Sequence, residues 1–310
     1  MIKVSITIAA YNNAQYLPET LDSIFNQTYK NFEVIIVDDA STDNTTEVLK
    51  VYRDRIKYHR FDVNQGSASA WNEAIRQATG EYIALAAADD VWMPDKLELQ
   101  MALFEQQPHL GLVYGRIISV DEAGQSLPKH LRQRRISLRL NWDKQYPIGP
   151  VFTELFMRSN FVPASTALIK KKAIEQTGWL DESLRLCQDY DFYLRIAHDF
   201  EFGFVDKVLV KYRRHPGSVS TGKRHRAFDY QRQVIDKMWR LFGSETLKVS
   251  DGKPITKILY RRRLAQQYAK EGRYYLRHGN KQLARESLAR SLKYQPFRFG
   301  TLVKYLLTYL

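Results

Sequence analysis

Two adjacent aspartates, Asp89 and Asp90, are the residues of this 310-residue chain whose chemistry can be inferred most directly. They follow the apolar run at residues 82–88, which predicts a buried strand that ends where the two carboxylates begin. Neighbouring negative charges repel each other, and a divalent cation bound by their oxygens would remove that cost. Helix capping is an equally good interpretation, because Pro94, Asp95 and an amphipathic segment follow.

The elements that must position these acids alternate along the first 120 residues. Short β-rich runs such as VSITIA and FEVIIVDD alternate with amphipathic segments, a pattern typical of a parallel sheet wound with helices. In an open α/β sheet, ligands bind along the edge where the carboxyl ends of the strands meet. We expect four polar strand ends at that edge: Tyr11 and Asn12, Asp38 and Asp39, residues 64–66, and Asp89 and Asp90.

The net charge of +13 is distributed unevenly, with −8 over residues 1–128, +10 over residues 129–254 and +11 over residues 255–310. An acidic first half accepts a diphosphate only with the help of a metal, whereas a basic tail attracts an anionic surface. We expect a membrane surface and no nucleic acid as partner, since the tail lacks aromatic stacking motifs. A solvated basic face on the tail helices is an equally good interpretation.

One cysteine, Cys187, excludes an internal disulfide and fits a reducing compartment. No apolar stretch reaches the roughly 18 residues needed to cross a bilayer, and the first residues do not resemble a signal peptide. We therefore expect a cytoplasmic protein, with the basic tail placing it peripherally on the inner face of the cytoplasmic membrane.

The pattern of elements predicts a division between a sheet-containing region at residues 1–223 and a basic helical region at residues 224–310. Within the first region we expect two halves, residues 1–119 and residues 120–223. The polar stretch up to about residue 145 is expected to be a loop that covers the substrate, or a solvated linker. In the second region, Gly279 and Asn280 predict the turn of a helical hairpin and Pro296 predicts its end.

Several segments resemble glycosyltransferase family 2 in the order in which that family carries them. VSITIAAYNN, IIVDDASTDNT and NQGSASAWNEAIRQATGEYIALAAADDVWMPDKLE resemble its nucleotide-sugar half. GWLDESLRLCQDYDFYLRIA and YRRHPGSVS resemble its later blocks, so the resemblance covers about residues 2–221. It implies a GT-A type fold, a Rossmann-like mixed α/β sheet flanked by helices, which this chain extends with a C-terminal helical appendage. It also implies that residues 1–119 form the nucleotide-sugar half and residues 120–223 the acceptor half.

The resemblance also implies the reaction, an inverting and metal-dependent transfer of a sugar from a nucleoside diphosphate sugar, with UDP as the expected nucleotide. The acceptor is then a hydroxyl of a glycan or lipid-linked acceptor, in surface polysaccharide or glycan assembly. Tyr11 would stack on the base, and Asp39 would accept a hydrogen bond from a uracil-type imide. The full set of implied nucleotide-sugar residues is Ala10, Tyr11, Asp39, Asn64, Gly66 and Asp89.

Mg²⁺ or Mn²⁺ is the cofactor that the resemblance implies, with Asp90, Asp89 and His215 as its ligands. The metal would neutralise the charge that develops on the leaving diphosphate. Ala87 stands where the family usually has a further acid. We expect Asp90 to carry most of the coordination, and Asp95 or its neighbours to cap the following helix.

Asp189 in the segment QDYDFYLR is the implied catalytic base, and Asp191 is the second candidate. Gln188 replaces the glutamate that the family usually carries before the base. Trp92 and Trp179 are candidates either for contacts with the acceptor sugar or for core packing. Because two acids of the family pattern are missing, a catalytically silent glycan- or nucleotide-binding protein of the same fold stays open as an alternative.

Overall fold

The computed structural model describes residues 4–127, 146–218, 225–243 and 254–309. The chain divides into two compact units, Met1–Ser218 and Val219–Leu310. Most of the polar stretch expected as a loop, residues 128–145, lies outside the described residues. The functional division of the first unit near residue 119 stays a prediction.

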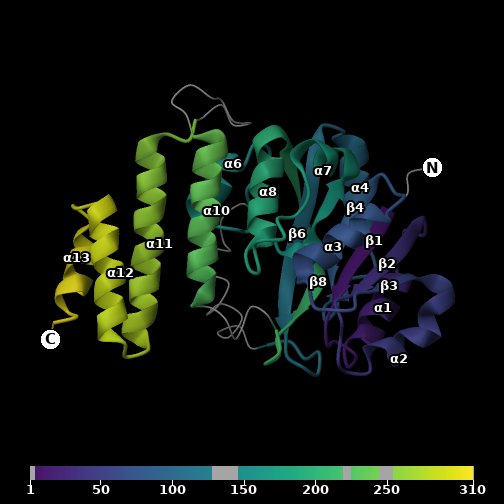
Figure 1. The fold of residues 1–310 in the computed structure, drawn as a ribbon. Helices are drawn as coiled ribbons and strands as arrows, with labels where there is room; N and C mark the ends of the chain where they lie inside the picture. The colour runs from purple at the N-terminus through teal and green to yellow at the C-terminus, as the bar shows by residue number, and fades with distance from the viewer. Residues whose placement is uncertain (1–3, 128–145, 219–224, 244–253, 310) are drawn as a thin grey trace. The chain divides into compact units, whose positions relative to one another are not determined.

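The first unit is built on a single eight-stranded mixed sheet with the strand order β3-β2-β1-β4-β7-β6-β8-β5 (Figure 1). The first four strands of that order run parallel, as the sequence predicts. Strand β7 is antiparallel to both of its neighbours, and β5 is antiparallel to β8. The strands are β1 (Val4–Ala10), β2 (Phe32–Asp38), β3 (Lys57–Arg60), β4 (Tyr82–Ala87), β5 (Val91–Trp92), β6 (Leu110–Val120), β7 (Leu168–Lys170) and β8 (Glu201–Arg213).

Helices flank this sheet because each presents one apolar face to it. Alternate residues of β1, among them Ile6 and Ile8, share a buried cluster with Leu21 of α1 and Met101 of α4, while α3 packs against β1 and β2. The described helices of the unit are α1 (Leu17–Phe25), α2 (Thr45–Leu49), α3 (Ser67–Arg76), α4 (Lys96–Gln106), α6 (Phe152–Arg158), α7 (Lys171–Thr177) and α8 (Gln188–Asp199), with short 3₁₀ turns at Lys50–Arg55 and Ala164–Thr166.

The carboxyl ends of the three central parallel strands lie side by side. Ala10 at the end of β1 pairs in register with Asp38 of β2, and Ala9 pairs with Ala87 at the end of β4. The residues that follow these strands therefore leave the sheet at one edge, as expected for an open α/β sheet.

The start of α4 differs from the sequence expectation. Asp95 occupies the N-cap position, but its side chain makes no capping hydrogen bond. The backbone N–H of Leu97 instead donates to Oε1 of Gln27, which lies just beyond α1, at 3.0 Å. A cap supplied from 70 residues away is invisible to a local pattern, and it ties α4 to α1.

The second unit consists of helices in its described part, namely α10 (Arg226–Phe242), α11 (Lys257–Arg277), α12 (Lys281–Tyr294) and α13 (Phe299–Leu306) (Figure 1). Helices α11 and α12 form the predicted hairpin: Gly279 has a φ of +75° at the turn, and the side chain of Asn280 accepts from the backbone N–H of Leu283 at 3.0 Å. Helix α12 ends shortly before Pro296, as predicted. No helix among the described residues has both the length and the apolar character needed to cross a membrane.

Candidate active site

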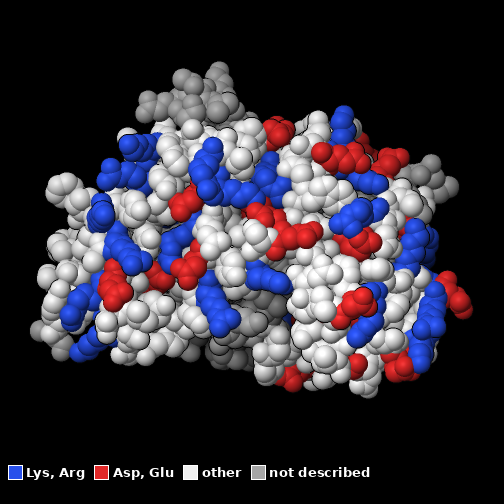
Figure 2. All heavy atoms as spheres, viewed as in Figure 1, with Lys and Arg blue, Asp and Glu red and all other residues white. Residues whose placement is uncertain are grey.

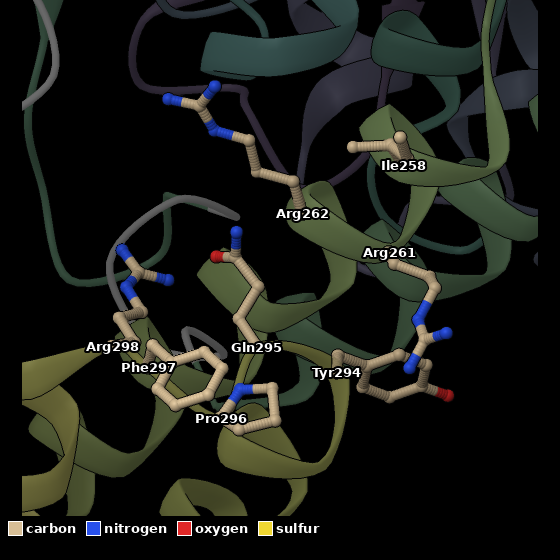
Figure 3. Close-up of a pocket in the computed structure, with 8 residues that line it drawn as sticks. All are labelled: Ile258, Arg261, Arg262, Tyr294, Gln295, Pro296, Phe297 and Arg298. Atoms are coloured by element: carbon tan, nitrogen blue, oxygen red, sulfur yellow. The ribbon is translucent and has the colours of Figure 1, made fainter.

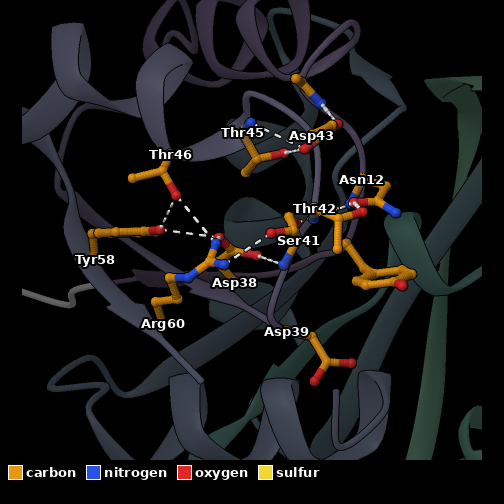
Figure 4. A network of polar contacts seen from close by, with 12 residues as sticks. Asn12, Asp38, Asp39, Ser41, Thr42, Asp43, Thr45, Thr46, Tyr58 and Arg60 are labelled. Atoms are coloured by element: carbon orange, nitrogen blue, oxygen red, sulfur yellow. Dashed lines mark hydrogen bonds and ion pairs between the residues drawn. The ribbon is translucent and has the colours of Figure 1, made fainter. Parts of the chain in front are cut away.

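The buried carboxylate of Asp38 holds the loop that follows β2. Its Oδ1 accepts from the backbone N–H of Ser41 at 2.8 Å, and its Oδ2 accepts from the Tyr58 hydroxyl at 3.0 Å and from Arg60 at 2.6 Å (Figure 4). Arg60 also donates to the carbonyl of Ser41 at 2.8 Å. With both oxygens committed in this way, Asp38 has a structural role and fixes the loop against β3.

The loops after β1 and β2 are joined by Asn12, which adopts a left-handed conformation with a φ of 54°. Its backbone N–H donates to the hydroxyl of Ser41 at 2.9 Å, and its side-chain oxygen accepts from the backbone of Thr42 at 2.8 Å (Figure 4). Beside this fixed backbone the ring of Tyr11 is 46 % exposed. Tyr11 thus presents an aromatic face to solvent at the ligand edge of the sheet.

Asp39 gathers the other residues expected to bind the nucleotide. Its backbone N–H donates to the carbonyl of Ala10 at 2.8 Å, and its carboxylate accepts from the backbone of Gln65 at 2.6 Å and of Gly66 at 2.8 Å. The side chain of Asn64 donates to the Asp39 carbonyl at 3.2 Å. Burial raises the pKa of Asp39, and the two backbone N–H groups oppose that rise.

Arg185 lies across Gly66 and was not identified from the sequence. Gly66 has a φ of +96°, which residues with a side chain rarely adopt, and a Cβ atom there would lie 2.4 Å from a guanidinium nitrogen of Arg185, which would have to move. The exposed guanidinium also lowers the pKa of Asp39, against the larger effect of burial. An arginine therefore stands beside the expected nucleotide site.

His215 and Asp89 meet in space although 126 residues separate them. Nε2 of His215 lies 2.9 Å from Oδ2 of Asp89, and the ring of Tyr16 packs on the imidazole with centroids 4.5 Å apart. Nε of Arg213 donates to the backbone carbonyl of Asp89 at 2.9 Å, which fixes the turn that carries the carboxylate. The Asp89 side chain keeps 19 % of its surface exposed.

Asp90, the neighbouring acid, is fully buried. Its Oδ1 accepts from the backbone N–H of Arg213 at 2.9 Å, and its Oδ2 accepts from the hydroxyl of Ser165. Burial, and secondarily the charge of Asp89, raises the pKa of Asp90 to about 8. The two aspartates thus differ in environment: Asp89 faces the ligand edge, whereas Asp90 braces β4 against β8.

Asp189 lies in the first turn of α8 and is partly exposed. Its Oδ2 accepts from the side-chain amide of Asn160 at 2.7 Å, and its Oδ1 accepts from the backbone of Tyr190 at 2.8 Å. Burial raises the pKa of Asp189 to about 6 despite these donors. Asn160 was not identified from the sequence, because nothing local marks it as a partner of a residue 29 positions away.

Asp191 is fully buried and forms an ion pair with Arg195 at 3.0 Å, one turn further along α8. Arg195 also donates to the carbonyls of Thr177 and Trp179, each at 2.6 Å. Through Arg195, Asp191 therefore stabilises the segment before α8. Of the two tryptophans, Trp179 is 41 % exposed, whereas Trp92 is 2 % exposed and belongs to the core.

The side chains near Asp89 provide only part of the ligand set that a divalent cation needs. Among the described residues, no group of three or more His, Cys, Asp or Glu side chains is placed to hold a metal. Asp89 and His215 supply two donors 2.9 Å apart. Two ligands about 2.1 Å from one octahedral ion, at right angles, lie about 3 Å apart, and Mg²⁺ is commonly held by one or two side chains plus phosphates and water. The pair therefore fits such a cation if a diphosphate completes the coordination.

Comparisons with solved structures support the fold. Over 99 % of this chain and 89 % of the other, the structure resembles that of Staphylococcus aureus TarS in complex with UDP-GlcNAc, with a TM-score of 0.68 and 16 % identity. The mannosyltransferase PcManGT from Pyrobaculum calidifontis, solved with GDP-Man and Mn²⁺, gives a TM-score of 0.58 at 20 % identity over 98 % of this chain and 85 % of its own. The expected GT-A type fold is thereby confirmed.

Sequence comparisons extend the likeness to the family. An uncharacterized glycosyltransferase of Methanocaldococcus jannaschii is 30 % identical over 73 % of this chain and 77 % of its own length. Another from Rickettsia felis is 32 % identical over 68 % of this chain but only 34 % of its own length. The family model described as glycosyl transferase family 2 matches residues 5–175, more than half of the chain. This chain therefore belongs to glycosyltransferase family 2.

Proposed function

We propose that this enzyme transfers a sugar from a UDP-linked donor to an acceptor hydroxyl, with inversion at the anomeric carbon, in glycan or surface polysaccharide assembly. The observation that carries the proposal is the environment of Asp189. It is a partly exposed carboxylate with a raised pKa of about 6. The adjacent Gln188 donates from its side chain to the hydroxyl of Ser67 at 2.7 Å, directly after the loop that surrounds Asp39. This hydrogen bond links the proposed catalytic base, Asp189, through its neighbour Gln188 to the loop proposed to bind the nucleotide.

Donor binding is assigned to the residues around Asp39. The exposed ring of Tyr11 stacks on the base, and Asp39 accepts from the imide N–H. Each carboxylate oxygen of Asp39 accepts one backbone bond and keeps a second lone pair for a ligand. Support comes from TarS and the mannosyltransferase, which were solved with UDP-GlcNAc and GDP-Man, respectively.

For the cofactor, Mg²⁺ or Mn²⁺, we assign Asp89 and His215 as ligands, with Asp89 ahead of Asp90. Asp90 is buried and each of its oxygens accepts a hydrogen bond from the protein, whereas Asp89 keeps exposed surface beside an imidazole nitrogen. This reverses the order expected from the sequence. A bound divalent ion would neutralise the negative charge that develops on the leaving diphosphate.

The chemical step is assigned to Asp189. Its ionised carboxylate takes the proton of the acceptor hydroxyl while the oxygen attacks the anomeric carbon. The bond from that carbon to the diphosphate oxygen breaks, and the electron pair leaves with the nucleoside diphosphate. A base with a pKa near 6 is ionised at neutral pH yet strong enough to take a proton. Asn160 donates to Oδ2 of Asp189, and a second lone pair of that oxygen is left for the acceptor hydroxyl.

The experiment is a UDP-sugar turnover assay with Mn²⁺ on the wild type and two matched variants, Asp189→Asn and Asp191→Asn. We expect Asp189→Asn to lower turnover by about 10²-fold to 10⁴-fold while the thermal shift produced by UDP and Mn²⁺ persists. Asp191→Asn should keep turnover per folded molecule. Binding of UDP-sugars without turnover by the wild type on any acceptor would favour the silent alternative. The absence of any metal-dependent shift with UDP compounds would refute the site.

The cellular location that we propose is inferred from the charge of the C-terminal region. A net charge of +11 over residues 255–310 supports an enzyme at the inner face of the cytoplasmic membrane, near a lipid-linked acceptor.

A further inference from the structure

A cavity of about 430 Å³ lies within the second unit and is lined by cationic side chains. Arg261 and Arg262 come from the start of α11, and Arg298 comes from the segment between α12 and α13 (Figure 3). Tyr294 and Phe297 line it as well, and none of the described residues that line it is acidic. The side chains of Arg262 and Arg298 lie on one side of the cavity, whereas that of Arg261 points toward Tyr294 (Figure 3). Because Arg262 and Arg298 meet no carboxylate among the described lining residues, that side of the cavity is complementary to an anion.

The fold by itself does not favour this arrangement. The positive end of a helix dipole lies at its N-terminus, yet α11 begins with basic residues and has no acid in its first turn. Nη1 of Arg298 is buried and meets no acceptor among the described residues. Burial lowers the pKa of Arg298, and the charge of Arg262 lowers it further. These guanidinium groups thus repel one another where the helix already concentrates positive charge.

Two acids in the described part of this unit have partners that do not line the cavity. Glu271 forms an ion pair with Arg232 at 2.9 Å, and Asp236 accepts from the hydroxyl of Tyr260 at 2.9 Å. More basic than acidic side chains lie over α11 and α12 in the space-filling view (Figure 2). A bound anion would balance the positive charge that the described lining residues leave in the cavity.

Helix α13, which follows Arg298 directly, is turned with its apolar side outward. Its exposed residues recur at helical spacing: Phe299, Leu302, Val303 and Leu306. The buried positions on the opposite side of this segment are the polar residues Thr301 and Thr308. Beside the cavity, the ring of Phe297 is 100 % exposed. A surface helix in water has the reverse arrangement, so this outer face suits an apolar environment.

We propose that the cavity binds the phosphate of an anionic phospholipid headgroup while Phe297 and the outer face of α13 enter the membrane interface. Arg262 and Arg298 hold the phosphate oxygens, for which a guanidinium provides paired donors. A phosphate site rimmed by exposed apolar side chains favours a lipid over RNA, which offers the same phosphate but no acyl chains. The proposal adds a site to the proposed function and does not depend on the transfer reaction.

The test is co-sedimentation of the full chain with vesicles of phosphatidylglycerol in phosphatidylcholine, compared with pure phosphatidylcholine. We expect binding to the anionic vesicles only. The double variant Arg262→Gln/Arg298→Gln should lower the partition coefficient about tenfold or more. Phe297→Ser should lower it at least about threefold with all charges kept. Glycerol phosphate at millimolar concentration should compete only weakly, since it has no acyl chains.

The matched control is Arg277→Gln, which removes one charge at the other end of α11. Fifteen residues of helix place it about 22 Å from Arg262, beyond a Debye length of about 8 Å at physiological salt. It should bind vesicles like the wild type. Equal losses in Arg277→Gln and Arg262→Gln would overturn the cavity in favour of diffuse charge attraction. Displacement from vesicles by RNA would favour a nucleic-acid site, and dimers dispersed by Leu306→Ser would show that a second copy covers α13.

UDP-sugar turnover in detergent-free buffer separates this proposal from the transferase assignment. The double variant should keep turnover on a soluble acceptor, because neither arginine belongs to the candidate active site. Thermal unfolding of each variant checks that the second unit is intact. Wild-type turnover without vesicle binding would refute the lipid site alone.

Discussion

The side-chain amide of Gln188 donates a hydrogen bond to the hydroxyl of Ser67 at 2.7 Å, across 121 residues of chain. Ser67 begins α3, directly after the glycine whose N–H bonds to Asp39, and Gln188 begins α8, directly before Asp189. One contact therefore relates the expected nucleotide loop to the expected base. Gln188, which stands where the family usually has glutamate, thus has a hydrogen-bond partner of its own in Ser67. Its side-chain amide can donate this bond, which a carboxylate cannot do.

Replacing Gln188 by glutamate should change the pH profile. A carboxylate beside Asp189 adds a like charge in a partly buried place, so the pKa of Asp189, already raised to about 6 by burial, rises by roughly one more unit. The acid limb of the pH profile of kcat/KM should therefore shift to higher pH by the same amount. Gln188→Met loses the bond to Ser67 without adding charge, and its limb should stay near pH 6. A Gln188→Glu profile that superimposes on the wild type would count against Asp189 as the titrating base.

Asn160 should act through Asp189. Its amide donates to the ionised carboxylate, so Asn160→Ala removes a bond that holds the pKa of Asp189 down. We expect activity to fall at pH 6 and to recover by about pH 8, with the limb shifted up by about one unit. Asn72→Ala is the control, because Asn72 bonds to the carbonyl of Leu180. Asn72→Ala should lower the free energy of unfolding and leave the acid limb of the pH profile unchanged. A shift of the limb in both variants would show that the effect is not specific to Asn160.

The two aspartates after β4 should separate in a thermal-shift assay with UDP and Mn²⁺. Asp89→Ala removes a partly exposed carboxylate, so the metal-dependent shift should vanish with little change in the unliganded melting temperature. Asp90→Ala leaves the hydroxyl of Ser165 and the N–H of Arg213 without their buried acceptor, which costs about 1–3 kcal/mol of stability. Its shift should persist. The opposite pattern would restore Asp90 as the leading ligand.

Asp191→Asn should reduce stability without affecting the chemical step. The substitution leaves the buried charge of Arg195 unpaired, which costs about 3–5 kcal/mol. Denaturant unfolding measures this loss, and turnover per folded molecule should stay near that of the wild type. Asp199→Asn, at the exposed end of the same helix, should change stability by less than about 0.5 kcal/mol. If Asp191→Asn abolishes turnover while fully folded, Asp191 rather than Asp189 is the base.

Lys96 is a buried lysine whose removal should stabilise the protein. Its ammonium lies over the ring of Trp92 and donates to Gln100 at 2.8 Å, and burial lowers its pKa to about 7. Between about pH 7 and its ordinary pKa of 10.5, the unfolded chain holds a proton that the folded chain releases, so stability rises with pH over that window.

Lys96→Met should therefore gain about 1–3 kcal/mol at pH 7 and lose this pH dependence, which contributes up to about 1.4 kcal/mol per pH unit. Denaturant unfolding of both proteins at pH 7, 8 and 9 measures the difference. Lys96→Arg, which keeps a charge that cannot be released, should be less stable than either. Parallel pH curves for the wild type and Lys96→Met would contradict the assignment.

Much of the fold could be predicted because its signals are local. Alternating strand and helix patterns identify β1 to β4, and the turn at Gly279 and Asn280 identifies the α11–α12 hairpin. The antiparallel insertion of β7 between β4 and β6 could not be read in this way. The local pattern predicts a strand in this segment, but the neighbours and the direction of a three-residue strand are determined by tertiary packing.

The sequence predicts individual candidate residues of the site, but it does not predict which of them lie next to one another. Asp39, Asp89 and Asp189 each follow or begin an element, and such positions are visible in a linear chain. The burial of Asp90 depends on Ser165, 75 residues away, and no local spacing predicts it. Asn160 and Arg185 were missed for the same reason, since their importance lies in what they meet.

Arg213 sets the order in which this unit can be completed during synthesis. It is the last residue of β8, and its backbone reaches Asp90 across 123 residues. A chain made only as far as residue 212 therefore contains both aspartates but lacks the backbone N–H from which Asp90 accepts. Such a chain also lacks the Arg213 side chain, which donates to the carbonyl of Asp89. The turn that carries Asp89 and Asp90 thus gains these contacts only when the end of β8 has been synthesised.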